Sequence, residues 1–311
     1  MVLYSYILKG DGEMKFISYI FDNDESFGIL NKDDTAVIPM DILFNKLKME
    51  VPKNLLEFIR TYSDSFIPDL QEAINNSHNN TIPLKNIKII APIQYPRRNI
   101  FCLGKNYADH AMEVQSLPDG EAAIPNYPIY FTKVADPAIG HMDKVIIPKD
   151  YTQKIDYEVE LAIVIGKDGK DISPEEAENY IFGYTIGNDI SARDIQTKHI
   201  QWFKGKSLDT FTPMGPYLVH KSEIGFPVEL DITSKVNGEI RQKSNTKNLI
   251  FDIPTIISDL SKGLTLRAGD IILTGTPAGV GIGFKPHKYL KSKDVVECYI
   301  EKIGTLVNII E

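Results

Sequence analysis

Three carboxylates alternate with other residues in the segment Asp156-Tyr157-Glu158-Val159-Glu160, which reads as part of a strand. Because strand side chains point alternately to opposite faces, Asp156, Glu158 and Glu160 share one face, with successive carboxylates about 6.6 Å apart. Like charges this close are unfavourable without a counter-charge. A cation that prefers oxygen ligands, such as Mg²⁺, Mn²⁺ or Ca²⁺, would supply one. The alternative is a solvated strand face that pairs with Lys or Arg.

A second predicted strand, over residues 183–188, ends directly before Asp189. Functional residues concentrate where strands run into loops, so Asp189 could complete a site of three carboxylates. The alternative is an aspartate that only stabilises its own turn. Arg193 and Asp194 follow closely, and we interpret them as a local ion pair without a catalytic role.

A histidine and a glutamate lie three residues apart in a helix predicted over residues 107–115, which Asn106 can cap. At this spacing His110 and Glu113 are neighbours on one helix face. A histidine beside a carboxylate can act as a general acid or base. A surface pair on an amphipathic helix is the alternative. The polar loop that follows, residues 116–121, could serve as a lid.

Two lysines and a glycine-rich loop complete the candidate residues. Lys206 and Lys133 could stabilise an enolate or bind a carboxylate, or they could simply be solvated. The loop over residues 274–283 offers many backbone N–H groups, including that of Gly275, together with the Thr276 hydroxyl. It could bind a carboxylate, or it could be a plain tight turn. Its glycine spacing matches neither a P-loop nor a dinucleotide fingerprint.

The composition excludes several classes of protein. Lys and Arg total 34 against 42 Asp and Glu, and the net charge of −8 argues against a nucleic-acid partner. The apolar runs are strand-sized, far short of the length that crosses a bilayer, and the N-terminus resembles no signal peptide. Only Cys102 and Cys298 occur, so no disulfide framework is possible, and both are predicted to be buried thiols. We therefore expect a cytoplasmic protein without a membrane partner.

These residues need elements that position them, and the pattern predicts two domains. Residues 1–90 read as a small α/β domain, with strands over 15–21 and 36–40, turns at 23–25 and 31–34, and a helix beginning near Pro52. A polar run, residues 75–81, reads as a linker in which His78 is solvated. Residues 91–311 read as a β-rich α+β domain. Its strands are predicted at 88–92, 100–103, 129–133, 145–148, 158–165, 183–188, 214–219, 230–236, 270–274 and 295–300, and its helices at 107–115, 174–179 and 253–261.

Five motifs, taken together and in order, resemble the fumarylacetoacetate hydrolase superfamily. They are FCLGKNYADHAMEV, PIYFTK, DYEVELAIVIGK, FGYTIGNDISARD with GKSLDT downstream, and ILTGTPAGVG. The resemblance spans roughly residues 92–309. It implies a mixed β-roll catalytic domain, which follows the small N-terminal α/β domain in the chain, and it implies a homodimer. The long N-terminal part resembles the bacterial acylpyruvase and oxaloacetate decarboxylase branch.

The resemblance also implies a role for each candidate residue. Glu158, Glu160 and Asp189 match the ligands of Mg²⁺ or Mn²⁺. His110 and Glu113 match a lid-helix dyad that orients or activates water, and Lys206 matches a lysine that faces the substrate. Residues matching positions that line the site and hold the substrate carboxylate are Lys133, Gly275 and Thr276.

The activity implied is metal-dependent C–C bond cleavage of a small 2-oxo (β-diketo) acid through an enolate stabilised by the metal and Lys206. Such a protein acts as an oxaloacetate decarboxylase or an acylpyruvate hydrolase. One alternative is an enol–keto isomerase of the 2-hydroxyhepta-2,4-diene-1,7-dioate type, from aromatic catabolism. The other is a protein that uses the metal only for binding or as a scaffold.

Overall fold

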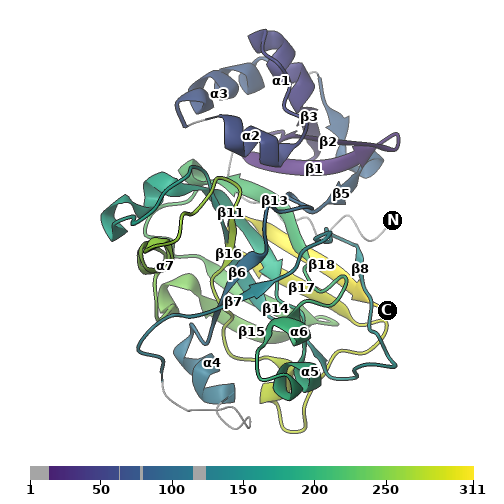
Figure 1. Cartoon of the computed structure of the whole chain (residues 1–311). Helices are drawn as coiled ribbons and strands as arrows, with labels where there is room; N and C mark the ends of the chain where they lie inside the picture. The colour runs from purple at the N-terminus through teal and green to yellow at the C-terminus, as the bar shows by residue number, and fades with distance from the viewer. Residues whose placement is uncertain (1–13, 63, 78–79, 115–123) are drawn as a thin grey trace.

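Eleven strands form one sheet, and these strands come from residues between Lys15 and Leu273 (Figure 1). The computed structural model describes residues 14–62, 64–77, 80–114 and 124–311. Within them the sheet order is β4 (Ile82–Pro83), β3 (Ala36–Pro39), β2 (Asp24–Leu30), β1 (Lys15–Phe21), β13 (Met214–His220), β11 (Ile181–Asn188), β10 (Val159–Ile165), β16 (Ile271–Leu273), β6 (Ile100–Gly104) and β7 (Ile129–Lys133). Strand β5 (Lys88–Ile90) pairs with β1.

A second sheet packs against the central strands of the first. Its order is β15 (Glu239–Asn245), β14 (Asp231–Val236), β17 (Val295–Ile300), β18 (Gly304–Ile310) and β8 (Lys144–Val145), and a short pair joins β12 (Ser191–Ala192) to β9 (Ile155–Asp156). The predicted apolar face of β10 fills the space between the sheets. Val159, Leu161, Ile163 and Ile165 are fully buried in one core with residues of β14, β17 and β18. The expected α+β, β-rich fold is confirmed.

Seven α-helices surround the sheets in the described residues. They are α1 (Met40–Leu47), α2 (Leu55–Thr61), α3 (Ile67–Asn75), α4 (Ala108–Glu113), α5 (Arg193–Lys198), α6 (Phe203–Lys206) and α7 (Ile253–Ser261). Shorter 3-10 helices cover Asp64–Phe66, Leu84–Asn86, Pro174–Tyr180, Lys221–Glu223, Thr246–Asn248 and Gly281–Gly283. None of the helices in the described ranges could span a membrane.

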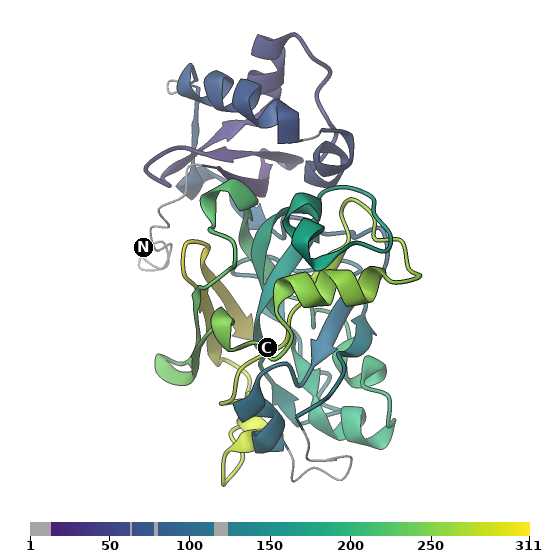
Figure 2. The ribbon, with the colours of Figure 1, turned by 90° about the vertical axis from the view of Figure 1, so that its left-hand side faces the viewer.

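The predicted helix over residues 253–261 is confirmed, and its ends have local causes. The Asp252 side chain accepts a hydrogen bond from the Thr255 N–H and so caps the first turn, where Pro254 is tolerated. Its apolar side chains, including Ile256 and Ile257, enter the core between the sheets. Figure 2 shows α7 lying across the face of this lower, β-rich body.

The N-terminal part joins the rest through both backbone and side chains. Strand β1 pairs antiparallel with β13, so the sheet is continuous across the predicted boundary at residue 90. Above this junction, α1, α2 and α3 cover the N-terminal strands (Figure 1). The Phe58 ring lies 5.3 Å from Phe16 and 6.1 Å from Phe182, centroid to centroid, and so links α2 to β11. The division into domains 1–90 and 91–311 stays a prediction.

Several local predictions need correction. Residues 23–25 were expected to form a turn, but the turn is Asp22–Asn23, with φ of 51° and 72°, and Asp24 already pairs with Phe21 in β2. Two left-handed residues produce the tight turn whose twist suits a hairpin. The strand expected over 36–40 ends at Pro39, because α1 begins at Met40. Among the elements that were not predicted are helices α1, α3, α5 and α6 and strands β2, β15 and β18. His78 and the loop over 116–121 lie outside the described residues.

We expect the aromatic cluster around Phe58 to contribute strongly to stability. Phe58 is fully buried, so Phe58→Ala should lower the free energy of unfolding by ~3–5 kcal/mol, through lost burial and a cavity. The control is Tyr127→Ala, which removes an aromatic ring that is 80% exposed and should change stability by less than about 0.5 kcal/mol. Denaturant unfolding measures both. Equal effects would contradict the assignment of the cluster as the link between the two parts.

Candidate functional site

Three buried carboxylates meet where β10 and β11 pair. Glu158 and Glu160 flank Val159 at the start of β10, and Asp189 directly follows β11. The register Val159↔Asn188 brings these ends together, and the Asp189 N–H donates to the Glu158 carbonyl. Carboxylate oxygens of all three residues lie within 4.8 Å of one another. Hereafter this set of three is the acidic triad.

Asp156 does not join the triad, although the alternation predicted that it shares its face. It lies on β9, a separate strand that pairs with β12, whereas β10 pairs with β11. Its carboxylate accepts hydrogen bonds from Arg193 Nε at 2.9 Å and from the N–H groups of Gly281 and Ile282. Arg193 therefore pairs with Asp156, and not with its neighbour Asp194 as expected. A guanidinium nitrogen of Arg193 also lies 2.7 Å from Glu158 Oε1.

Two buried lysines supply most of the counter-charge. Lys206 Nζ lies 2.6 Å from both Glu158 Oε2 and Asp189 Oδ2. Lys133 Nζ lies 2.6 Å from Asp189 Oδ1 and also donates to the Ile190 carbonyl. Burial lowers the pKa of Lys206, but the charges of Asp189 and Glu158 outweigh it, so this pKa stands above its ordinary value. Both lysines are therefore parts of the site, and the solvated alternative is wrong for them.

The two glutamates differ in their electrostatic environment. Burial raises the pKa of Glu158, but Lys206 and Arg193 outweigh burial and lower it to about 2. Glu160 forms no ion pair with any described residue and accepts a hydrogen bond from the Gly275 N–H at 2.7 Å. Burial, then the charges of Asp189 and Glu158, raise the pKa of Glu160 well above its usual range. A bound cation would offset this repulsion.

The donor set fits a divalent cation. The acidic triad offers carboxylate oxygens only, which hard cations such as Mg²⁺ prefer, and one of its members lacks a counter-charge. Each of the three is at most 4% exposed, so solvent screens the repulsion between them only weakly. The acidic triad is a candidate divalent metal site, as the sequence predicted.

His110 and Glu113 come together on α4, as the spacing predicted. His110 Nδ1 and Glu113 Oε2 lie 3.3 Å apart. The Gly279 N–H lies 3.0 and 3.1 Å from the two Glu113 oxygens, and the Tyr157 hydroxyl donates to the Gly279 carbonyl at 2.9 Å. At Gly283 a side chain would meet Glu113, since a Cβ there would lie 2.0 Å from Oε1. The glycine-rich loop thus holds the glutamate that orients His110.

Asn106 does not cap α4, which begins after Tyr107 without a side-chain cap. Its amide instead donates to the carbonyls of Phe251 and Thr274 and accepts from the Phe251 N–H. Asn106 is fully buried, so these bonds satisfy it where solvent cannot. It therefore joins the segment before α4 to two segments far away in the chain and fixes where the helix starts.

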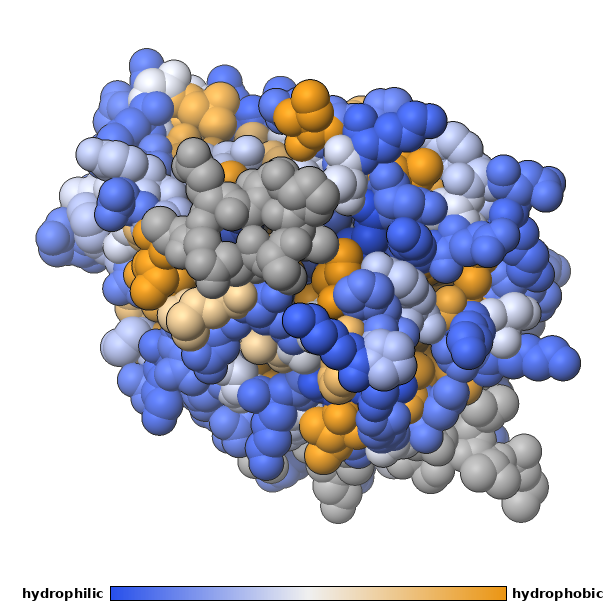
Figure 3. Space-filling view, turned by 90° about the horizontal axis from the view of Figure 1, so that it is seen from below, coloured by the Kyte–Doolittle hydropathy of each residue, from blue (hydrophilic) through white to orange (hydrophobic). Residues whose placement is uncertain are grey.

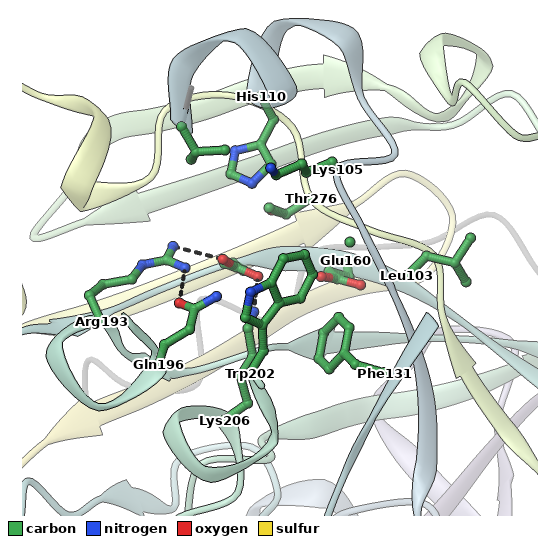
Figure 4. A pocket seen from close by; sticks show the side chains of 13 residues that line it. Leu103, Lys105, His110, Phe131, Glu160, Arg193, Gln196, Trp202, Lys206 and Thr276 are labelled. Carbon is green, nitrogen blue, oxygen red and sulfur yellow. Dashed lines mark hydrogen bonds and ion pairs between the residues drawn. The ribbon is translucent and has the colours of Figure 1, made fainter. Parts of the chain in front are cut away.

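A pocket opens onto the acidic triad between α4 on one side and α5 and α6 on the other (Figure 4). Of the predicted site residues, His110, Glu158, Glu160, Lys206 and Thr276 line it. The close-up shows His110 above the carboxylates and the Trp202 ring in front of them. Further lining residues, which sequence reasoning did not assign to the site, are Leu103, Gly104, Lys105, Val114, Phe131, Arg193, Gln196 and Trp202.

Of the residues predicted to bind the substrate, Lys133 and Gly275 lie behind this lining, and Thr276 borders the pocket. Lys133 is completely buried against Asp189. The Gly275 N–H binds Glu160. The Thr276 hydroxyl donates to the Val159 carbonyl and accepts from the Gln242 amide, so it supports β10 although it borders the pocket. The substrate-binding roles expected for these residues stay predictions.

Seen from below, the face that carries α4, α5 and α6 is mostly hydrophilic, with apolar residues in separate patches (Figure 3). The carboxylates of the acidic triad and their lysine partners are buried, so they do not form part of this surface. A β-rich fold that buries an acidic triad beside a histidine–glutamate pair and a lysine brings together the groups that metal-assisted acid–base catalysis uses.

Comparison with known proteins identifies the family. Residues 99–311 match the fumarylacetoacetate (FAA) hydrolase C-terminal family, and the chain belongs to it. It is 54% identical over 225 residues to a protein of Bacillus subtilis strain 168 named oxaloacetate tautomerase YisK, covering 72% of this chain and 73% of that protein. It is 41% identical over 266 residues to the mitochondrial oxaloacetate tautomerase fahd2 of Xenopus laevis, covering 85% and 80%.

A solved structure supports the same assignment across the whole fold. The fumarylacetoacetate hydrolase of the psychrophilic Exiguobacterium antarcticum superimposes with a TM-score of 0.78 at 36% identity. The match covers 96% of this chain and 99% of that one, so the N-terminal part is included. The sequence-based identification of the superfamily is confirmed.

We expect Mg²⁺ to raise the unfolding temperature of the protein, because a ligand that binds only the folded state stabilises it by mass action. In Glu160→Gln, which keeps the size of the side chain and an acceptor for the Gly275 N–H, this increase should be lost. Thermal unfolding with Mg²⁺ and with a chelator measures the effect. The control is Glu72→Gln on the exposed face of α3. An unchanged response in Glu160→Gln would show that the cation binds elsewhere.

Proposed function

We propose that this protein interconverts the enol and keto forms of oxaloacetate or of a similarly small 2-oxo diacid. The observation that carries the proposal is the pocket itself, in which Glu158 and Glu160 of the acidic triad, His110 and Lys206 face one small space, with Asp189 directly behind. The two relatives above are named oxaloacetate tautomerases, which makes isomerisation the first choice among the activities expected from the sequence.

The reaction moves one proton without changing the composition of the substrate. The enol loses the proton of its C2 hydroxyl and gains one at C3. We propose Mg²⁺ or Mn²⁺ as the cation at the acidic triad, where it would polarise the 2-oxo group as a Lewis acid. His110 would transfer the proton, since Glu113 contacts its Nδ1 and leaves Nε2 for the substrate. The Lys206 ammonium would stabilise the negative charge that develops on the substrate oxygen.

C–C cleavage is the second candidate function, as an oxaloacetate decarboxylase or an acylpyruvate hydrolase. The specific observation in its favour is the anchored His110–Glu113 pair, since the Gly279 N–H fixes Glu113 in a position to make His110 a base for water. The metal-dependent scaffold stays the non-enzymatic alternative. We further propose a cytoplasmic homodimer.

One experiment separates these candidates. Enol oxaloacetate, prepared in an aprotic solvent, is diluted into buffer with Mg²⁺, and the loss of its ultraviolet absorbance is followed with and without the protein. Pyruvate is measured in the same samples by its NADH-dependent reduction. We expect the enol to disappear faster with the protein, without added pyruvate. Pyruvate formation above the His110→Ala control would favour decarboxylation instead. With neither effect, the same pyruvate assay on an acylpyruvate separates the hydrolase, which releases pyruvate, from the scaffold, which does not.

In this assay we expect His110→Ala to reduce tautomerisation by about 10²–10⁴-fold, the usual contribution of a general acid or base. The variant must be compared at the same Mg²⁺ concentration, because the free ion promotes reactions of oxaloacetate. An unchanged rate in a folded variant would remove His110 from the mechanism.

Gly283→Ala tests whether the position of Glu113 matters. The added methyl group would collide with the flexible end of Glu113 and not with the backbone, so the fold should persist while the carboxylate moves. We expect turnover to fall about 10²-fold, as for a misplaced catalytic group, with little change in unfolding temperature. Gly225→Ala is the control, since no atom lies within 4 Å of its added methyl group. Equal activity of the two variants would contradict the role of the dyad.

A further inference from the structure

Lys105 stands out among the cations that line the pocket. It follows β6 directly and has a φ of 54°, in the left-handed region that residues other than glycine seldom adopt. Figure 4 shows it beside His110 and Thr276, on the rim above Glu160. Residues in this region recur at functional sites, and Lys105 combines this backbone with a position in the pocket lining.

The other two cations that line the pocket are already engaged with carboxylates. Arg193 contacts Asp156 and Glu158, and Lys206 contacts Glu158 and Asp189. By contrast, no carboxylate of the described residues forms an ion pair with Lys105, and its side chain is only partly buried. Lys105 is thus the lining cation that remains for an anionic ligand.

The charge of Lys105 also points to a substrate with two carboxylates. The divalent cation proposed above would hold one end of the substrate at the acidic triad, and the Lys105 ammonium would pair with a second carboxylate at the other end.

Beyond the cations, the glutamates and His110, the remaining lining residues carry no charge for a second carboxylate. Apart from the neutral Gln196 and Thr276, they are apolar, aromatic or glycine. The rings of Phe131 and Trp202 meet edge to face, 5.3 Å apart between centroids. Gly104 lies directly against Trp202, since a Cβ there would come within 2.1 Å of its ring. A second carboxylate therefore finds its counter-charge at Lys105.

We infer that Lys105 binds the distal carboxylate of the substrate and thereby selects 2-oxo acids that carry two carboxylates over those that carry one. The inference rests on the proposed function, which places the other end of the substrate at the acidic triad. Lys105 then acts as a specificity-determining residue. The proton transfer remains with His110.

The test compares two stable ligands that differ by the distal carboxylate, L-malate and L-lactate. Their binding to the Mg²⁺-loaded protein is measured by titration calorimetry, which requires no turnover. We expect wild type to bind malate more tightly than lactate, and Lys105→Met to lose about 10-fold or more of malate affinity while lactate affinity stays the same. Lys105→Arg, which keeps the charge, should retain most of the preference.

Lys48→Met is the matched control, because Lys48 has a φ of 56° but is exposed at the end of α1. It should bind both ligands like wild type, and unfolding temperatures establish that every variant is folded. The inference is overturned if wild type binds malate no more tightly than lactate. It is also overturned if Lys105→Met leaves both affinities unchanged or lowers both by the same factor.

Kinetics separate this inference from the proposed function. With oxaloacetate, Lys105→Met should raise KM about 10-fold with little change in kcat, because the contact is the same in the ground state and the transition state. A protein without tautomerase activity that still prefers malate through Lys105 would refute the proposed function and support the inference. Full tautomerase activity with an unchanged KM in Lys105→Met would support the proposed function and refute the inference.

Discussion

Three carboxylates buried within 4.8 Å of one another impose the constraint on which the rest of the structure depends. Uncompensated, such charges are among the most costly groups that a protein can bury. The chain meets the cost with Lys206, Lys133 and Arg193, which come from three separate segments. The packing of α5, α6 and β7 around β10 therefore follows from electrostatics as much as from apolar burial. Glu160, which has no such partner among the described residues, is what makes the site suited to a cation.

Much of this could be predicted from the sequence, because the relevant patterns are local. The alternation Val159-Glu160-Leu161 fixes which face of β10 is apolar, and the spacing of His110 and Glu113 fixes that they are neighbours. Glu158 and Glu160 were singled out with Asp156 as a cluster of like charges, and Asp189 as a residue at a strand end. Only the resemblance to the superfamily assigned Glu158, Glu160 and Asp189 together as metal ligands. The identification of the superfamily came from the order of five motifs and not from any one of them.

The parts that were missed depend on contacts distant in sequence. Arg193 was paired with its neighbour Asp194, whereas it binds Asp156, 37 residues away. Asn106 was interpreted as a helix cap, but it bonds to residues more than 140 positions further along the chain. A polar residue just before a helix can cap that helix, and its neighbours in the sequence suggest no other role. Only the tertiary structure shows that Asn106 is buried and bonds to distant backbone groups instead. The same holds for β15 and β18, whose pairing partners decide that they are strands.

The glycine-rich loop shows most clearly how the site is built. Its N–H groups were expected to bind a carboxylate, and they do bind carboxylates of the protein itself: Gly275 binds Glu160, Gly279 binds Glu113, and Gly281 binds Asp156. One loop thus holds a member of the acidic triad, the partner of His110 and the partner of Arg193. Backbone donors held rigidly in a buried loop need no reorganisation to stabilise charge. The relative positions of the acidic triad and the His110–Glu113 pair are therefore coupled through a single segment, and a shift in that loop would disturb both together.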